Sequence, residues 1–313
     1  MIYPPKLQPG DAVGIVAPAR KITPGQVEAA LETLVAWGLM PTLAKNIFSS
    51  KHSYLAGSDD ERREDFQKMI DDENVKAIFC ARGGYGSTRI IEELDFSPLK
   101  KSPKWIIGFS DITAFHLRLA SIGIASIHGT MPIFFDQPEA RGSVQSIHDI
   151  LFKGSCLIEV NPEDSNRPGR ASGQVVGGNL SLIVDALNTA SEPDTRNKIL
   201  VVEEVDEFLY KLDRMFTQLR RTGKLKDLSG LVIGHMTDLK NSDLAFGETA
   251  SEIILHAVRD YDYPVAFSFP SGHRNPNLAW IHGATADLDV SLNKASLSYP
   301  DIYSSDKYTS VKA

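Results

Sequence analysis

Short apolar runs alternate with stretches of helical periodicity along the first half of the chain. The apolar runs predict buried strands over residues 12–19, 75–81, 104–110 and 124–129. Between them, apolar residues recur every three or four positions, which predicts helices over 23–38, 57–72, 87–95 and 111–123. Strands that are apolar throughout and alternate with helices are typical of a parallel sheet covered on both faces. The first half therefore predicts an α/β domain.

A polar, turn-rich stretch separates this pattern from a second one. The sequence "FKGSCLIEVNPEDSNRPGRASG" is rich in turn formers, so we place a linker over 156–172. It divides a domain over 1–155 from a domain over 173–313. The later domain mixes strands over 198–204, 229–236, 264–273 and 279–299 with helices over 207–225 and 248–261.

Composition removes several classes of function. The chain has 313 residues, 42% of them hydrophobic, and a net charge of −7. It has no block of five basic residues, so nucleic acid and anionic membranes are poor candidates as partners. Its two cysteines, Cys80 and Cys156, form neither a disulfide framework nor a C-x-x-C metal motif. We see no signal peptide or membrane-spanning run, and we expect a cytoplasmic protein.

The stretch "ARGGYGSTR" (81–89) directly follows a predicted strand. Ligands of open α/β sheets bind at the carboxyl ends of strands, so such positions are candidate sites. The stretch is not a P-loop, because no Lys-Ser/Thr follows, and Arg89 stands where a dinucleotide fingerprint needs its third glycine. Its backbone N–H groups could hold an anion or an oxyanion, or the stretch could be a plain turn.

Ser110 stands between an apolar strand and a predicted helix, in "IIGFSDITAFH". A serine at such a junction is either a helix cap or a nucleophile lifted clear of the sheet. The surroundings match only half of the G-x-S-x-G elbow: Gly108 fits, whereas Ile112 replaces the second glycine. From the residues alone the cap is the favoured interpretation.

A nucleophilic serine needs a histidine base oriented by a carboxylate. Glu203 and Glu204 end one predicted strand of the second domain, and His235 and His273 lie at the ends of two others. A lone histidine is more often structural than catalytic. The two histidines are nearly tied, with His273 ahead because Pro, Ser and Gly surround it.

Six motifs occur in a fixed order and together resemble one family. They are "ARGGYGSTRIIEELD", "GFSDITAFH", "IHGTMP", "GQVVGGNLSLI", "LVVEEVDEFLYKLDRMFTQL" and "SGHRNPN". The set resembles the LD-carboxypeptidase family of serine peptidases, which also contains the microcin C immunity peptidases. The resemblance extends from about residue 8 to about residue 300.

The resemblance implies a site and a fold. Ser110 matches the family nucleophile, His273 its base and Glu203 its acid, and the N–H groups of Asp111 and Gly84 match its oxyanion hole. The family fold is an N-terminal parallel-sheet domain, like that of class I glutamine amidotransferases, and a smaller C-terminal β/β/α domain. The site would then lie between the domains. Family members are typically dimers, so we expect a homodimer.

One departure from the family pattern leaves an alternative acid open. Glu204 stands where the family usually has Asp, and it is itself acidic. From the sequence, Glu204 could therefore replace Glu203 as the acid of the triad.

The family activity implied is hydrolysis of the L,D-amide bond that releases terminal D-alanine from a murein tetrapeptide or muropeptide, with no metal and no cofactor. Arg82, Tyr85 and Asn179 are the candidate substrate-binding residues, and Arg89 and Arg214 are further candidates for holding a carboxylate. Two alternatives remain: an amidase acting on aminoacyl-nucleotide conjugates, as in microcin C immunity, and a two-lobed small-molecule binding protein without turnover.

Overall fold

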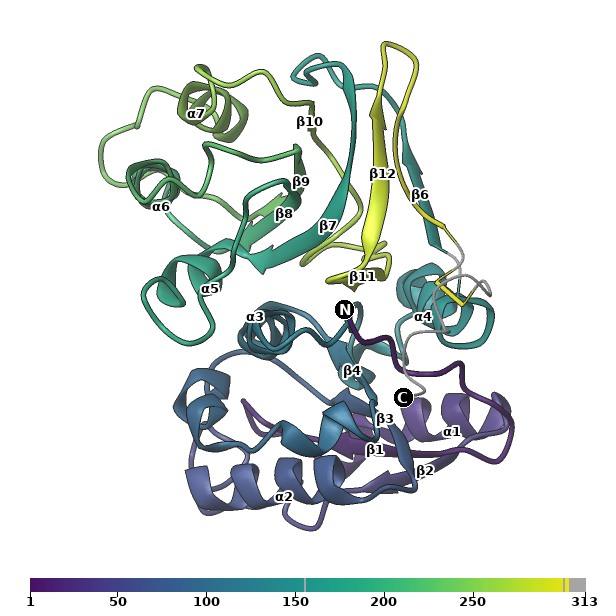
Figure 1. Ribbon diagram of the computed structural model, residues 1–313. Helices are drawn as coiled ribbons and strands as arrows, with labels where there is room; N and C mark the ends of the chain where they lie inside the picture. The colour runs from purple at the N-terminus through teal and green to yellow at the C-terminus, as the bar shows by residue number, and fades with distance from the viewer. Residues whose placement is uncertain (155, 301, 304–313) are drawn as a thin grey trace.

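The computed structural model describes residues 1–154, 156–300 and 302–303, which form two sheets that lie one above the other in Figure 1. The first sheet has the order β11-β5-β4-β3-β1-β2. Five of its strands are parallel: β1 (Ala12–Val16), β2 (Met40–Leu43), β3 (Val75–Cys80), β4 (Trp105–Gly108) and β5 (Ser126–His128). This is the parallel α/β domain that the apolar runs predict.

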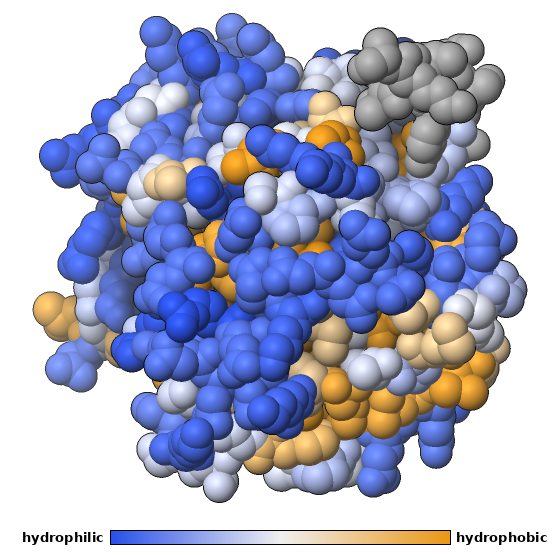
Figure 2. All heavy atoms as spheres, turned by 60° about the horizontal axis from the view of Figure 1, so that its bottom comes forward, coloured by the Kyte–Doolittle hydropathy of each residue, from blue (hydrophilic) through white to orange (hydrophobic). Residues whose placement is uncertain are grey.

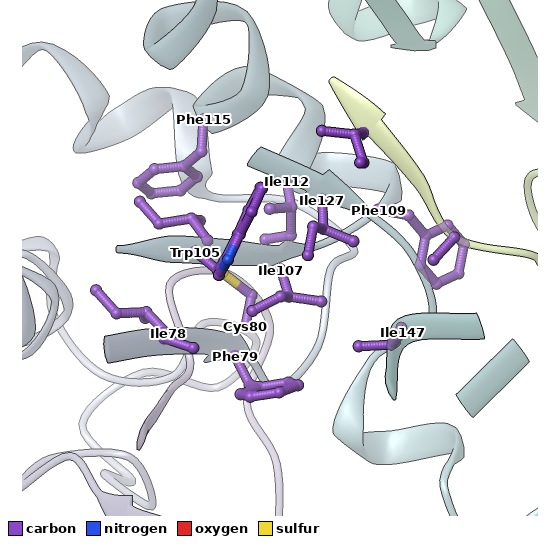
Figure 3. Packing of buried hydrophobic residues seen from close by; sticks show 14 of the residues in the cluster. Ile78, Phe79, Cys80, Trp105, Ile107, Phe109, Ile112, Phe115, Ile127 and Ile147 are labelled. Atoms are coloured by element: carbon purple, nitrogen blue, oxygen red, sulfur yellow. The ribbon is translucent and has the colours of Figure 1, made fainter. Parts of the chain in front are cut away.

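Helices cover this first sheet, and its core is closely packed. They are α1 (Glu28–Ala36), α2 (Asp59–Asp71), α3 (Thr113–Ser121) and α4 (Arg141–Lys153). Figure 3 shows the packing around Trp105 and Phe115, which are both fully buried. The Phe115 ring stacks on Phe66 of α2, with ring centroids 4.4 Å apart. Helix α2 begins at a capping box in which Ser58 accepts the N–H of Glu61.

The second sheet has the order β10-β9-β8-β7-β12-β13-β6. Its parallel half comprises β7 (Gly169–Asn179), β8 (Lys198–Val205), β9 (Gly230–Thr237) and β10 (Val265–Ala266). Its antiparallel half comprises β12 (Thr285–Val290), β13 (Ala295–Tyr299) and β6 (Cys156–Val160). Helices α5 (Leu180–Asp185), α6 (Leu209–Arg221) and α7 (Ala250–Ala257) lie beside the parallel half (Figure 1).

Three predicted segments differ from the structure. The stretch 156–172 contains β6 and the start of β7, because residues 156–160 pair with β13. The helix predicted over 87–95 is instead two short 3-10 turns; Ile91 and Leu94, three residues apart, are both buried, which suits three residues per turn. The strand predicted over 264–273 ends at Ala266, and a loop carries the rest.

One strand from the end of the chain completes the first sheet. Strand β11 (Trp280–His282) pairs antiparallel with β5, so the division at 156–172 does not separate the two sheets cleanly. Thr113 of α3 makes a second connection, since its hydroxyl accepts the N–H of Asn179 at 2.9 Å. The two domains are therefore joined by a shared strand as well as by packing.

The surface is mostly polar. The face shown in Figure 2 is largely hydrophilic, with an apolar area toward its lower right. Val35 and Met40 are among the large apolar side chains that stay exposed. No helix within residues 1–154, 156–300 and 302–303 is long and apolar enough to cross a membrane. The expected homodimer stays a prediction.

Candidate active site

Ser110 lies at a sharp turn between β4 and α3. Its φ is +62°, in the left-handed region that a residue with a side chain adopts only at a cost. A Cβ on Gly108 would approach the Ile112 side chain to 2.9 Å. The Ile112 side chain therefore leaves room only for glycine at position 108. The Ser110 hydroxyl caps no helix and instead pairs with His273. The cap interpretation favoured by the local pattern is therefore wrong.

A chain of two hydrogen bonds crosses from one domain to the other. Ser110 Oγ lies 2.9 Å from His273 Nε2, and His273 Nδ1 lies 2.7 Å from Glu203 Oε2. Glu203 is fully buried near the carboxyl end of β8, whereas His273 lies in the loop after β10 and is partly exposed. The serine, the imidazole and the carboxylate thus meet in the order that nucleophilic catalysis needs.

Backbone contacts fix the loop that carries His273. Gly272 has a φ of +123°, and a Cβ there would lie 2.8 Å from Glu203 Oε2, so only glycine lets the loop approach the carboxylate. The N–H of Gly272 donates to Asn277 Oδ1. His235 holds the same loop: its backbone N–H donates to the Ser271 carbonyl, and its Nδ1 accepts the N–H of Arg274. His235 is therefore a structural neighbour of His273.

His235 and His273 differ in how readily they take up a proton. Burial acts to lower the pKa of His273, but the charge of Glu203 and its hydrogen bond, with a smaller effect from Glu204, outweigh burial and raise that pKa above its usual value. Burial, reinforced by Arg274 and His273, lowers the pKa of His235 to about 4. His273 is thus the histidine that readily takes up a proton, as a general base must.

Glu204 and Asn179 take no part in the hydrogen bonds between Ser110, His273 and Glu203. Burial raises the pKa of the Glu204 carboxyl, which accepts hydrogen bonds from Asn179 Nδ2 at 3.0 Å and the Ser181 N–H at 2.8 Å. Asn179 Oδ1 accepts the N–H of Leu182 and so caps α5. This geometry gives Glu203, not Glu204, the contact with His273. Asn179 is only 4% exposed, and its side chain already has hydrogen-bond partners within the protein.

The glycine loop, residues 82–86, lies against the turn that carries Ser110. A Cβ on Gly83 would lie 3.2 Å from Ser110 Cβ and 3.4 Å from the Asp111 nitrogen. Gly84 and Gly86 have φ values of +109° and +136°, which glycine adopts without strain. The backbone of this loop and the N–H of Asp111 are thus close neighbours, as the candidate oxyanion hole requires.

Two buried side chains hold the glycine loop. The Asp111 carboxylate accepts the N–H of Ser87 at 2.9 Å, and burial raises the pKa of this carboxyl. The Arg62 guanidinium donates to the carbonyl oxygens of Pro18 and Gly86 and pairs with Asp59. Sequence reasoning missed Arg62, because "DDERREDF" is typical of a solvated helix face.

The candidate substrate-binding residues have different environments. Arg89 forms a bidentate ion pair with Asp59, and Arg214 lies over the Tyr210 ring, 5.3 Å from its centroid. Arg82 donates only a long hydrogen bond, 3.4 Å, to the Lys21 carbonyl. Tyr85 is about half exposed, at 49%. The Tyr85 hydroxyl is hydrogen-bonded to the Arg89 side chain. Arg82 is therefore the candidate that keeps most of its donors free for a ligand.

No group of three or more His, Cys, Asp or Glu side chains in the part of the chain that the structure describes is arranged to hold a metal ion. Both cysteines are free thiols, and burial raises the pKa of each, that of Cys156 to about 12.

Comparison with known families matches both domains. Residues 13–129 match the LD-carboxypeptidase N-terminal domain, and residues 172–288 match the LD-carboxypeptidase C-terminal domain. A probable murein peptide carboxypeptidase of Bacillus subtilis is 36% identical over 299 residues, which cover 92% of each chain. The murein tetrapeptide carboxypeptidase of Pseudomonas aeruginosa is 30% identical, covering 90% of this chain and 94% of its own.

Solved structures agree with this match. A muramoyltetrapeptide carboxypeptidase from Oxalobacter formigenes is 27% identical, with a TM-score of 0.85, and covers 93% of this chain and 99% of its own. The microcin C7 self immunity protein MccF in complex with aspartyl sulfamoyl adenosine has a TM-score of 0.84 over 96% of this chain and 99% of its own, but at 20% identity it shares only the fold. The chain belongs to the LD-carboxypeptidase family and is an enzyme of the serine peptidase type.

Proposed function

We propose that this protein is an LD-carboxypeptidase that releases terminal D-alanine from murein tetrapeptide, with Ser110 as nucleophile, His273 as base and Glu203 as the orienting acid. One observation carries the proposal: the hydrogen-bonded chain Ser110–His273–Glu203, assembled from two domains. The murein peptide activities named for the Bacillus and Pseudomonas relatives support the choice of substrate.

The first half of the reaction cleaves the amide. His273 Nε2 takes the proton of Ser110 as Oγ bonds to the carbonyl carbon on the L side of the scissile bond. Glu203 stabilises the imidazolium that forms. The N–H groups of Gly84 and Asp111 bind the oxyanion, and removing such a donor in other enzymes costs about 3–4 kcal/mol. The carbon–nitrogen bond then breaks, and His273 gives its proton to the departing amine of D-alanine.

The second half releases the remaining peptide. Water attacks the ester that joins the peptide to Ser110 Oγ, and His273 Nε2 takes one of its protons. When the ester bond breaks, His273 returns that proton to Ser110, and the peptide leaves with a free carboxylate. Ser110 and His273 thus return to their starting protonation states, and the reaction needs no reactant besides water.

The aminoacyl-nucleotide amidase has no comparable support from the tryptophans. Such a substrate would be favoured by an exposed aromatic platform for its base. Trp105 and Trp280 are buried at 0% and 1% exposure, and Trp37 packs edge-on against Phe152 of α4. The three tryptophans are thus engaged in the core or against α4.

The test is release of D-alanine from purified L-Ala-γ-D-Glu-meso-diaminopimelate-D-Ala, assayed with wild type and the Ser110→Ala variant. We expect release by the wild type and a loss of at least about 10⁴-fold in the variant, since removing a triad member typically removes most of the rate. Ser181→Ala is a matched control, because that hydroxyl bonds to Asn179 and not to His273. A Ser110→Ala variant that keeps turnover would refute the assignment.

A further inference from the structure

Two arginines flank the glycine loop beside the nucleophile. Arg20 follows β1 and Arg82 follows β3, and these strands are neighbours in the first sheet. The Arg20 side chain lies over Gly84, since a Cβ there would be 3.1 Å from Arg20 Cβ and 3.3 Å from Arg20 Cδ. Gly83, the residue before Gly84, lies against Ser110, since a Cβ there would be 3.2 Å from Ser110 Cβ. The arginines therefore lie at the edge of the Ser110 site.

Neither arginine has an acidic partner among residues 1–154, 156–300 and 302–303. The acidic residues at the start of α2 are already engaged: Asp59 pairs with Arg62 and Arg89, and Glu61 pairs with Lys51. Burial and the nearby positive charge of Arg20 lower the pKa of Arg82. Two like charges are thus held close together without a neutralising group, which costs energy unless an anion joins them.

The surrounding loops hold Arg20 in place. Its backbone N–H donates to the Gly83 carbonyl at 3.3 Å, and its guanidinium lies over the Tyr54 ring, 5.1 Å from the centroid. Residues 19–21 run antiparallel to residues 54–56, with a bridge between Arg20 and Leu55. Both flanking carbonyls, of Pro18 and Gly86, are held by Arg62. The position of Arg20 is therefore organised before any ligand binds.

We propose that Arg20 and Arg82 together bind the terminal carboxylate of the substrate and so make the enzyme a carboxypeptidase. The inference rests on the proposed function. A residue spans about 3.5 Å, so the carboxylate of a departing C-terminal residue lies beside the cleaved amide and its receptor must lie beside the nucleophile. Guanidinium groups suit this task, because each offers a carboxylate two parallel hydrogen bonds.

The experiment compares the tetrapeptide acid with its C-terminal carboxamide. The wild type is expected to prefer the acid in kcat/KM. Arg20→Met and Arg82→Met should each lower kcat/KM for the acid by about 10- to 100-fold and change that for the amide by less than about threefold, because only the acid loses a charged hydrogen bond. Arg170→Met is the control, since it removes an exposed arginine paired with Asp289 on the second sheet.

Binding to the Ser110→Ala protein, measured by calorimetry, separates this inference from the proposed function. If the wild type releases no D-alanine but Ser110→Ala binds the acid over the amide through Arg20 and Arg82, the proposed function fails and carboxylate recognition stands. If the arginine variants weaken acid and amide equally, or neither peptide binds, the inference is overturned whether or not D-alanine is released. Circular dichroism on each variant checks that the fold is kept.

Discussion

At the scale of single residues, the environment of each ionisable group decides its role. His235 and His273 are close neighbours, yet burial keeps His235 neutral and the carboxylate of Glu203 favours the charged form of His273. Glu203 and Glu204 are adjacent in β8 and point to opposite faces, so one meets His273 and the other the start of α5. Identical side chains thus acquire different roles within a few ångströms.

The raised pKa of His273 predicts the acid limb of the pH profile. A base must be neutral, so kcat/KM should fall as the pH decreases through this pKa, above the ordinary value for histidine. Glu203→Gln removes the carboxylate that favours the imidazolium, so the limb should move to lower pH and the plateau fall by about 10³–10⁴-fold. The measurement is kcat/KM from pH 4 to 9. An unmoved limb in Glu203→Gln would assign it to another group.

At the scale of elements, helix α2 holds the glycine loop through the side chain of Arg62. Arg62, on the buried face of α2, reaches the carbonyl oxygens of both Pro18 and Gly86, while Arg63 points outward and pairs with Asp60 and Glu93. Asp111 holds the same loop from the other side through the Ser87 N–H. The loop therefore depends on a helix that carries none of Ser110, Glu203 and His273.

The neighbouring arginines of α2 offer a matched pair of variants. Arg62→Met should leave two buried carbonyls without a donor, lower the free energy of unfolding by about 3 kcal/mol or more, and reduce kcat more than it changes KM. Arg63→Met should change both quantities little, because exposed ion pairs contribute at most about 1 kcal/mol. Urea unfolding and steady-state kinetics measure the two effects. Equal behaviour of the two variants would show that Arg62 does not position the loop.

At the scale of the whole molecule, a stack of buried aromatic rings lies where the domains join. His128 of β5 stacks on Trp280 of β11 at 4.7 Å, and His116 of α3 stacks on His282 of β11 at 5.7 Å. His282 Nε2 accepts the N–H of Gly177 in the second sheet at 3.1 Å, so this nitrogen carries no proton. His116, His128 and His282 are all fully buried, and burial is the main cause that lowers the pKa of each.

This stack predicts that the protein loses stability in mild acid. The pKa of His116 falls from 6.5 to about 4, so between these values the unfolded chain binds a proton that the folded chain excludes, and the free energy of unfolding decreases as the pH falls. His116 alone should contribute about 3 kcal/mol. His273 acts in the opposite direction: its raised pKa adds stability below the usual histidine pKa, which is lost as the pH rises through the raised value.

Urea unfolding at pH 7.5, 5.5 and 4.5 measures the loss. The His116→Asn variant should show a shallower dependence on pH, whatever its stability at pH 7.5. His256→Asn is the control, because the His256 side chain is 59% exposed. The same pH dependence in all three proteins would contradict a role for His116.

The sequence predicts the three side chains that meet at the site better than it predicts the side chains that hold the glycine loop. Ser110, Glu203 and His273 all follow or end apolar runs, and parallel strands bring their carboxyl ends to one edge of a sheet, so strand ends predict candidates. The choice between His235 and His273 needed the family resemblance, because which imidazole meets Ser110 depends on how two domains pack. Arg62 was not predictable, since its neighbours in sequence are also charged and the stretch is typical of a solvated helix face.

The strand β11 has a consequence for how the chain is made. Ser110 leaves the ribosome long before residues 280–282, which complete the first sheet. His273 is synthesised only shortly before those residues. Until then β5 has an unpaired edge, of the kind that invites association between chains. The nascent N-terminal half therefore carries Ser110 without its hydrogen-bond partner His273, and the strand that covers the open edge is translated within ten residues of that histidine.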